Sequence, residues 1–123
     1  MKIVTWNILA DRYLNKQRYP NIKDEGLFDW TYRKKIIIEK LLNENADIIA
    51  LQEVELSTFE EDFMNELSSY NFHRHQITKK RTNKIGNVTL FKNSDLVIKG
   101  QRETTHALIS DFVDFRIINV HLE

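Results

Sequence analysis

The sequence of 123 residues contains no cysteine, one proline and only three glycines. The absence of cysteine excludes a disulfide scaffold and a thiol nucleophile. The scarcity of glycine and proline excludes collagen-like and low-complexity chains. With 41% hydrophobic and 29% charged residues, the composition is that of an ordinary globular protein, and we expect a single domain over residues 1–123.

Long apolar runs and an excess of one charge are also missing. No run approaches the roughly 20 residues of a membrane span, and the first residues lack the basic region and apolar segment of a secretory signal. We therefore expect a cytoplasmic protein without a membrane partner. Lys and Arg number 18 and Asp and Glu number 18, so any contact with nucleic acid has to depend on a local patch.

The first half of the chain has the pattern of a strand, a helix and a second strand. Residues 2–9 form a short run of β-branched and aromatic residues, which is typical of a strand. Asp29 can cap a helix over residues 30–43, and Asn45 can end it. Residues 46–51 are almost continuously apolar, as in a strand buried on both faces. This order predicts a parallel pair of strands with a right-handed crossover.

The second half begins with a second helical pattern and then changes to strands. Ser57 followed by Glu60 has the spacing of a capping box, and four apolar residues follow at helical spacing: Phe59, Phe63, Leu67 and Tyr70. Strand-like segments then recur at residues 72–78, 87–92, 105–110 and 116–122. The last third is therefore predicted to be mostly antiparallel sheet.

Polar residues stand near the ends of three predicted strands. Asn7 lies in the first strand, Gln52 and Glu53 follow the second, and Asn119 and His121 lie in the last. Ligands collect at the carboxyl ends of strands in sheets with helical crossovers. Asn119 and His121 are two residues apart, so they share a face of their strand. If these strand ends are neighbours, an amide, a carboxylate and an imidazole converge.

Such a set suits phosphate chemistry. Glu53 is a candidate ligand for Mg²⁺, with Mn²⁺ as an alternative, because Mg²⁺ prefers one or two carboxylates plus waters and phosphate oxygens. Asn7 could orient a water or a phosphate oxygen, and His121 could donate a hydrogen bond to developing negative charge. Simpler interpretations stay open: Glu53 as a solvated turn residue, Asn7 as a strand-ending amide and His121 as a histidine bonded to the backbone. The chain has no G-x-S-x-G, P-loop or H-E-x-x-H motif.

Two further segments have alternative interpretations. The basic turn around Lys79, Arg81 and Lys84 is either solvated protection of a sheet edge or a phosphate clamp, and Lys79, Arg81 and Asn119 are the candidate substrate-binding residues. The long polar loop from Asp11 to Gly26 hints at function by its length. Nearby aromatic residues could stack a nucleobase or pack onto the sheet: Tyr13, Tyr19, Phe28 and Trp30.

Five ordered segments resemble a known family: Thr5–Tyr13 (TWNILADRY), Trp30–Lys34 (W-x-x-R-K), Ala46–Glu55 (ADIIALQEVE), Gly86–Lys92 (GNVTLFK) and Ile118–Glu123 (INVHLE). They are similar to the motifs of the endonuclease/exonuclease/phosphatase family, in the branch of the CCR4-type deadenylases and nocturnin. The resemblance implies that Asn7 contacts phosphate or water, that Glu53 binds Mg²⁺ and that His121 contacts the scissile phosphate. It also implies hydrolysis of a phosphodiester, with RNA or a nucleotide as substrate.

The resemblance covers only the N-terminal half of that family's domain. The later G-D-x-N and S-D-H motifs do not occur in these 123 residues. We therefore expect an α/β fold that is half of a four-layer α/β/β/α sandwich, with one mixed sheet and two helices on one face. The other face should be apolar, and a partner chain with the second half, a second copy in a homodimer or a rearranged packing would have to cover it. Without the missing motifs, the alternative to a phosphodiesterase is a non-catalytic binding or assembly module.

Overall fold

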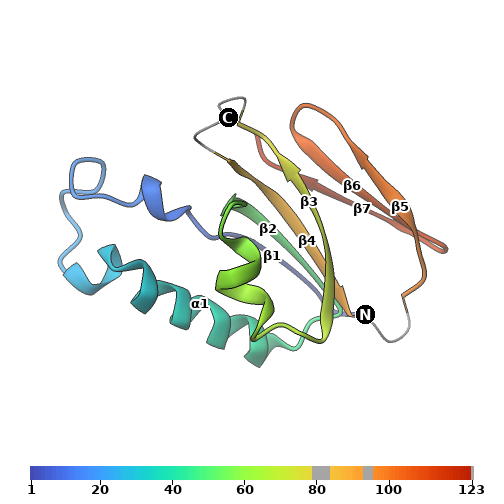
Figure 1. The fold of residues 1–123 in the computed structure, drawn as a ribbon, viewed down its shortest axis with the longest axis horizontal. Helices are drawn as coiled ribbons and strands as arrows, with labels where there is room; N and C mark the ends of the chain where they lie inside the picture. The colour runs from blue at the N-terminus through green and yellow to red at the C-terminus, as the bar shows by residue number, and fades with distance from the viewer. Residues whose placement is uncertain (79–83, 93–95, 123) are drawn as a thin grey trace.

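The computed structural model describes residues 1–78, 84–92 and 96–122, which form two β-sheets with helical segments beside the first of them (Figure 1). The first sheet has the strand order β1 (Ile3–Asn7), β2 (Ile48–Glu55), β4 (Ile85–Lys92) and β3 (Tyr70–Gln76). The second has the order β5 (Ile98–Glu103), β6 (Ala107–Phe112) and β7 (Arg116–Val120). The helical segments are η1 (Asp11–Tyr13), η2 (Glu25–Phe28), α1 (Trp30–Glu44) and η3 (Glu60–Met64). The predicted α/β class is confirmed.

The strand–helix–strand unit forms as predicted. β1 pairs in parallel with β2, and α1 makes the crossover between them. The side chain of Asp29 caps α1 by accepting a hydrogen bond from the N–H of Thr31 at 3.0 Å. Asn45 ends the helix in the left-handed conformation, with φ of 46°. In the described part of the chain, no helix is both long and apolar enough to cross a bilayer.

The main core lies between the first sheet and the helical segments. It is built from apolar residues of α1, of the segment around η3 and of strands β2 and β4, chiefly Ile37, Leu41, Ile49, Leu51, Phe59, Phe63, Leu67 and Leu90. Each fully buried aliphatic or aromatic side chain contributes roughly 1.5–3 kcal/mol. This core fixes the carboxyl ends of β1 and β2 relative to each other.

The second predicted helix is much shorter than its pattern suggested. Only Glu60–Met64 forms a π-helical turn, and no side chain caps it, so the predicted capping box of Ser57 and Glu60 is wrong. Tyr70 starts strand β3 instead of ending a helix. Burial explains the spacing, since Phe59, Phe63 and Leu67 all reach the core from a compact connection between β2 and β3.

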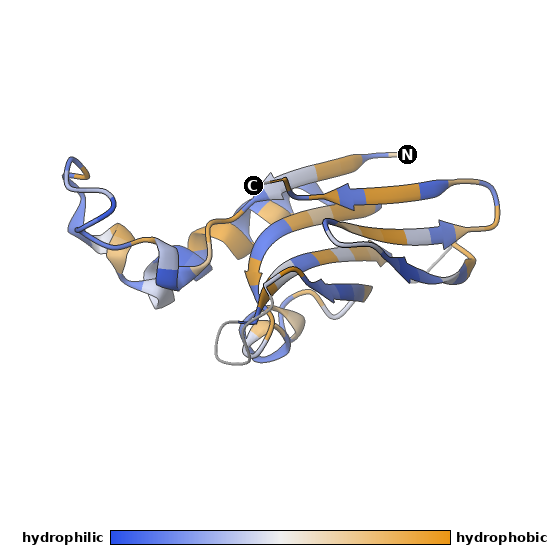
Figure 2. Cartoon of the chain, turned by 90° about the horizontal axis from the view of Figure 1, so that it is seen from above, coloured by the Kyte–Doolittle hydropathy of each residue, from blue (hydrophilic) through white to orange (hydrophobic). Residues whose placement is uncertain are grey.

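The last three strands form a sheet of their own, which corrects the expectation of one mixed sheet. β6 and β7 pack on the face of β2, β3 and β4 opposite α1, so this face is covered within the chain rather than open to water. Ile48, Phe91 and Phe112 form the centre of this second, smaller core. Apolar and polar residues follow one another along the strands (Figure 2), and such alternation lets a short sheet cover one apolar face. Strand β5 was not predicted.

Candidate active site

Asn7 lies at the carboxyl end of β1, at the start of a tight turn. Its side-chain Oδ1 accepts a hydrogen bond from the N–H of Leu9 at 3.0 Å, and Leu9 has a positive φ of 55°. The carbonyl of Ile8, between them, accepts a hydrogen bond from Nη1 of Arg33 at 2.7 Å. The turn is therefore held from two sides, and it directs the amide of Asn7 toward β2.

Glu53 lies in a β-bulge within β2, whereas the sequence placed it after the strand. The pairing of β2 with β4 shifts register between Leu51 and Val54, and Glu53 has a positive φ of 54°. Ile49 and Leu51 face the helix-side core before the bulge, and Val54 and Leu56 face it afterwards. The bulge thus reverses the alternation of the strand and turns Glu53 out of the core toward the sheet end.

His121 directly follows β7 and reaches Glu53 from the second sheet. Its Nε2 lies 3.6 Å from Oε1 of Glu53, and the two side chains are 25% and 17% exposed. Nδ2 of Asn7 donates a hydrogen bond to the same Oε1 at 3.0 Å. The structure therefore brings together the amide, the carboxylate and the imidazole that the sequence placed at three strand ends.

The other oxygen of Glu53 fits a cation ligand. Oε2 is buried and has no hydrogen-bond partner within the described residues. A buried carboxylate oxygen without a partner is costly unless something positive or a donor meets it. In those same parts of the chain there is no cluster of three acidic, histidine or cysteine side chains that could hold a metal ion. A single carboxylate is compatible with Mg²⁺, which is held by one or two protein carboxylates together with waters and phosphate oxygens.

Asn119 and Gln52 lie in the interior between the sheets. Asn119 is 2% exposed, and its Nδ2 donates to the carbonyls of Leu51 and Val88 at 3.1 and 3.0 Å. Its Oδ1 accepts from Nε2 of Gln52 at 2.8 Å. Asn119 and His121 share a face, as predicted, but the contacts of Asn119 join the two sheets and do not point to a substrate. The remaining candidates, Lys79 and Arg81, lie outside the described residues.

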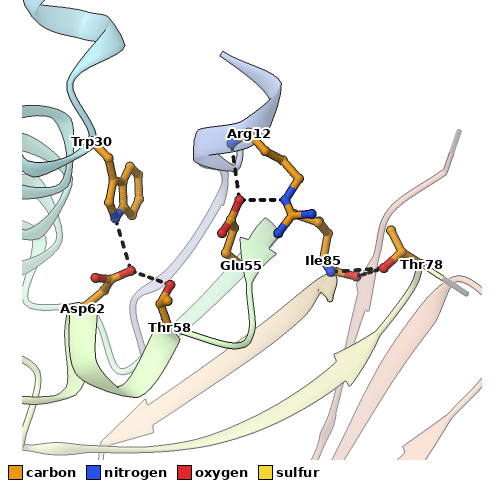
Figure 3. A network of polar contacts seen from close by, with 7 residues as sticks. All are labelled: Arg12, Trp30, Glu55, Thr58, Asp62, Thr78 and Ile85. Carbon is orange, nitrogen blue, oxygen red and sulfur yellow. Dashed lines mark hydrogen bonds and ion pairs between the residues drawn. The ribbon is translucent and has the colours of Figure 1, made fainter. Parts of the chain in front are cut away.

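A network of polar contacts links η1, the start of α1, the end of β2 and η3 (Figure 3). Glu55 accepts from the N–H and the Nε of Arg12 at 3.2 and 2.9 Å, which ties η1 to the end of β2. Asp62 accepts from Nε1 of Trp30 at 3.2 Å and from the hydroxyl of Thr58 at 2.8 Å. Burial and the nearby carboxylate of Glu55 raise the pKa of Asp11.

Arg33 is a supporting residue whose role the sequence did not indicate. It is 9% exposed, its guanidinium lies 4.9 Å from the ring centre of Trp30, and its Nε and Nη2 are buried without a partner within the described residues. Burial lowers the pKa of Arg33. The W-x-x-R-K segment contains both residues, but only the fold shows that Arg33 reaches the carbonyl next to Asn7.

Comparison with known proteins decides the family. The sequence model of the Endonuclease/Exonuclease/phosphatase family matches residues 4–109. The chain belongs to the endonuclease/exonuclease/phosphatase family. Carbon catabolite repressor protein 4 homolog 1 of Arabidopsis thaliana is 32% identical over 83 residues, which are 68% of this chain and 13% of that protein. The CCR4-Not complex 3'-5'-exoribonuclease subunit Ccr4 of Schizosaccharomyces pombe is 30% identical over 105 residues, which are 78% of this chain and 15% of that protein.

Solved structures of this endonuclease/exonuclease/phosphatase fold are similar over nearly the whole chain. ANGEL2, a 2',3'-cyclic phosphatase, superposes with a TM-score of 0.76 at 17% identity, covering 98% of this chain and 41% of that one. The human nocturnin catalytic domain superposes with a TM-score of 0.67 at 20% identity, covering 91% and 43%. The chain thus spans less than half of these structures and a smaller share of the curated relatives.

Proposed function

We propose that this chain carries one part of the active site of a phosphodiesterase that hydrolyses RNA or a nucleotide and depends on Mg²⁺ or Mn²⁺. The observation that carries the proposal is the convergence of Asn7 and His121 on one carboxylate oxygen of Glu53, where the two sheets end. Membership of the endonuclease/exonuclease/phosphatase family supports a phosphate ester as the substrate class.

Each of the three side chains has a distinct role in this proposal. Glu53 would hold the cation through its unpartnered Oε2, and Asn7 fixes the carboxylate by donating to Oε1 at 3.0 Å. When bound, Mg²⁺ supplies a Lewis acid that offsets negative charge on phosphate oxygens. His121 presents Nε2 toward the same space and donates a hydrogen bond to a phosphate oxygen as negative charge develops there.

The remaining catalytic groups would come from polypeptide outside these 123 residues. No G-D-x-N or S-D-H segment occurs in the sequence, so no second acidic residue or histidine of that kind is available. A partner chain or a second copy of this chain could supply them, and the cytoplasm is the expected compartment. A non-catalytic assembly module that keeps the cation site is the alternative outcome of the experiments below.

Cation binding is tested by adding Mn²⁺ to the ¹⁵N-labelled chain and following the paramagnetic broadening of amide signals. We expect broadening centred on residues 7, 53 and 121, and its loss in Glu53→Gln. Glu61→Gln removes an exposed glutamate of η3 and serves as the charge-matched control. Equal broadening in wild type and Glu53→Gln would contradict the cation site.

Activity is tested with labelled RNA, Mg²⁺ and a fragment of a relative that carries the G-D-x-N and S-D-H motifs. We expect cleavage that falls by about 10²-fold or more in His121→Ala and in Glu53→Gln, as for other groups that meet charge developing in the transition state. Cation binding at Glu53 without cleavage in any combination would favour the assembly module. Cleavage that survives both substitutions would refute the proposed site.

A further inference from the structure

A recess opens beside Glu53 on the side of the long loop between β1 and α1. Leu9, Tyr13, Arg18, Tyr19 and Glu53 line it, and its volume is about 360 Å³. Protein pockets for small ligands span roughly 300 to 1,000 Å³, so this recess is large enough for one small unit of a substrate. Because Glu53 lines it, whatever occupies the recess lies next to the proposed cation.

The loop that carries the recess is held in place by its own contacts. Asn15 accepts hydrogen bonds from the N–H of Arg18 through Oδ1 and from the N–H of Tyr19 through its carbonyl, both at 2.9 Å. Lys16 pairs with Glu25 across the loop at 2.8 Å. The turn around Asn15 therefore presents Arg18 and Tyr19 as neighbours without needing a ligand to order them.

The charge and exposure of the recess residues favour an anion with an aromatic ring. The guanidinium of Arg18 lies 5.2 Å from the ring centre of Tyr13, and Arg18 enters no ion pair within the described residues. Its N–H groups are therefore available for a phosphate, for which the guanidinium fork is well shaped. Tyr19 is 38% exposed, which leaves ring surface on which a planar base can stack.

We propose that this recess binds one nucleotide of the substrate, with its base against Tyr19 and a phosphate on Arg18, next to the phosphate that meets Glu53. The inference rests on the proposed function and names the part of the substrate that this chain recognises. Stacking on a tyrosine tolerates every base, so the recess selects a nucleotide and not a sequence. The other two aromatic candidates of the loop region differ: Trp30 packs edge-on against Phe63 at 6.1 Å, and Phe28 is only partly exposed.

The test compares AMP, adenosine and ribose 5-phosphate as ligands of the ¹⁵N-labelled chain. We expect AMP to bind most tightly and to shift the amide signals of residues 9–19. Tyr19→Leu should weaken AMP binding by about 5- to 100-fold, to the affinity of ribose 5-phosphate. Tyr19→Phe keeps the aromatic ring and should keep the affinity for AMP. Arg18→Gln should weaken AMP and ribose 5-phosphate but leave adenosine unchanged.

Matched controls separate the recess from general surface effects. Tyr32 is 45% exposed on α1, so Tyr32→Leu removes a comparable ring elsewhere, and Lys35→Gln removes an exposed positive charge of the same helix. Equal AMP affinity in Tyr19→Leu and Tyr32→Leu would refute nucleotide binding in the recess. Amide-signal shifts confined to other parts of the chain would refute it as well. That failure is distinct from failure of the proposed function, which would appear as cation binding and cleavage that do not depend on Glu53.

Discussion

Replacing Asn119 by alanine is expected to weaken the contact between the two sheets severely. Its amide makes short hydrogen bonds to Leu51, Val88 and Gln52 at 3.1, 3.0 and 2.8 Å, and a longer one to the hydroxyl of Thr89 at 3.3 Å. At about 1 kcal/mol for each bond, the free energy of unfolding should fall by about 3 to 4 kcal/mol. This is a large fraction of the roughly 5–15 kcal/mol that holds an ordinary domain folded.

Urea unfolding at pH 7, followed by tryptophan fluorescence, measures the change. Asn71→Ala, an exposed asparagine on β3, is the control and should alter the free energy of unfolding by less than about 0.5 kcal/mol. Asn119→Asp should be at least as harmful as alanine, because a carboxylate would face the carbonyl oxygens of Leu51 and Val88. A loss below about 1 kcal/mol in Asn119→Ala would refute the bridging role, since that is the net worth of one hydrogen bond.

Two further predictions concern the strands around the site. Gly86→Ala should lower the urea midpoint by the equivalent of about 1–3 kcal/mol, because a Cβ at this position would collide with the carbonyl oxygen of His75. Gly100→Ala is the control and should leave the midpoint unchanged, because a Cβ there has no neighbour within 4 Å. Equal midpoints for the two variants would contradict the close approach of β3 to Gly86. Burial lowers the pKa of His73, whose Nδ1 lies 2.9 Å from the hydroxyl of Ser110, so the unfolded chain binds the proton more readily. The free energy of unfolding should therefore fall as pH drops through the unfolded pKa of about 6.5. Urea titrations at several pH values measure this dependence, which His73→Gln should flatten. The same pH dependence in wild type and His73→Gln would refute the contribution of His73.

The elements that the sequence predicted are those set by local patterns. The cap at Asp29, the end at Asn45 and the buried run of β2 each depend on residues close in sequence, and all appear in the structure. The shared face of Asn119 and His121 follows from the two-residue period of a strand. For the same reason, the convergence of Asn7, Glu53 and His121 was predictable once the strand ends were assumed to be neighbours.

The features that were not predicted depend on contacts between distant segments. No glycine or proline marks the bulge at Glu53, which becomes visible only when β2 is paired with β4. The second sheet forms because the faces of Ile48 and Phe91 need an apolar cover, which Phe112 provides from far along the chain. In the sequence, Arg33 is indistinguishable from the other charged residues of its helix. Its role is visible only in the fold, where it donates a hydrogen bond to the carbonyl of Ile8.

The positive φ of Glu53 is unfavourable for the backbone, yet it accompanies the placement of the carboxylate beside Asn7 and His121. A residue with a side chain loses about 1 kcal/mol or more in the left-handed conformation, whereas glycine adopts it freely. At φ of 54°, glycine at position 53 would relieve this backbone strain, but it would remove the carboxylate that accepts from Asn7 and faces His121. Relief of backbone strain and retention of the candidate site therefore make opposite demands on this one position.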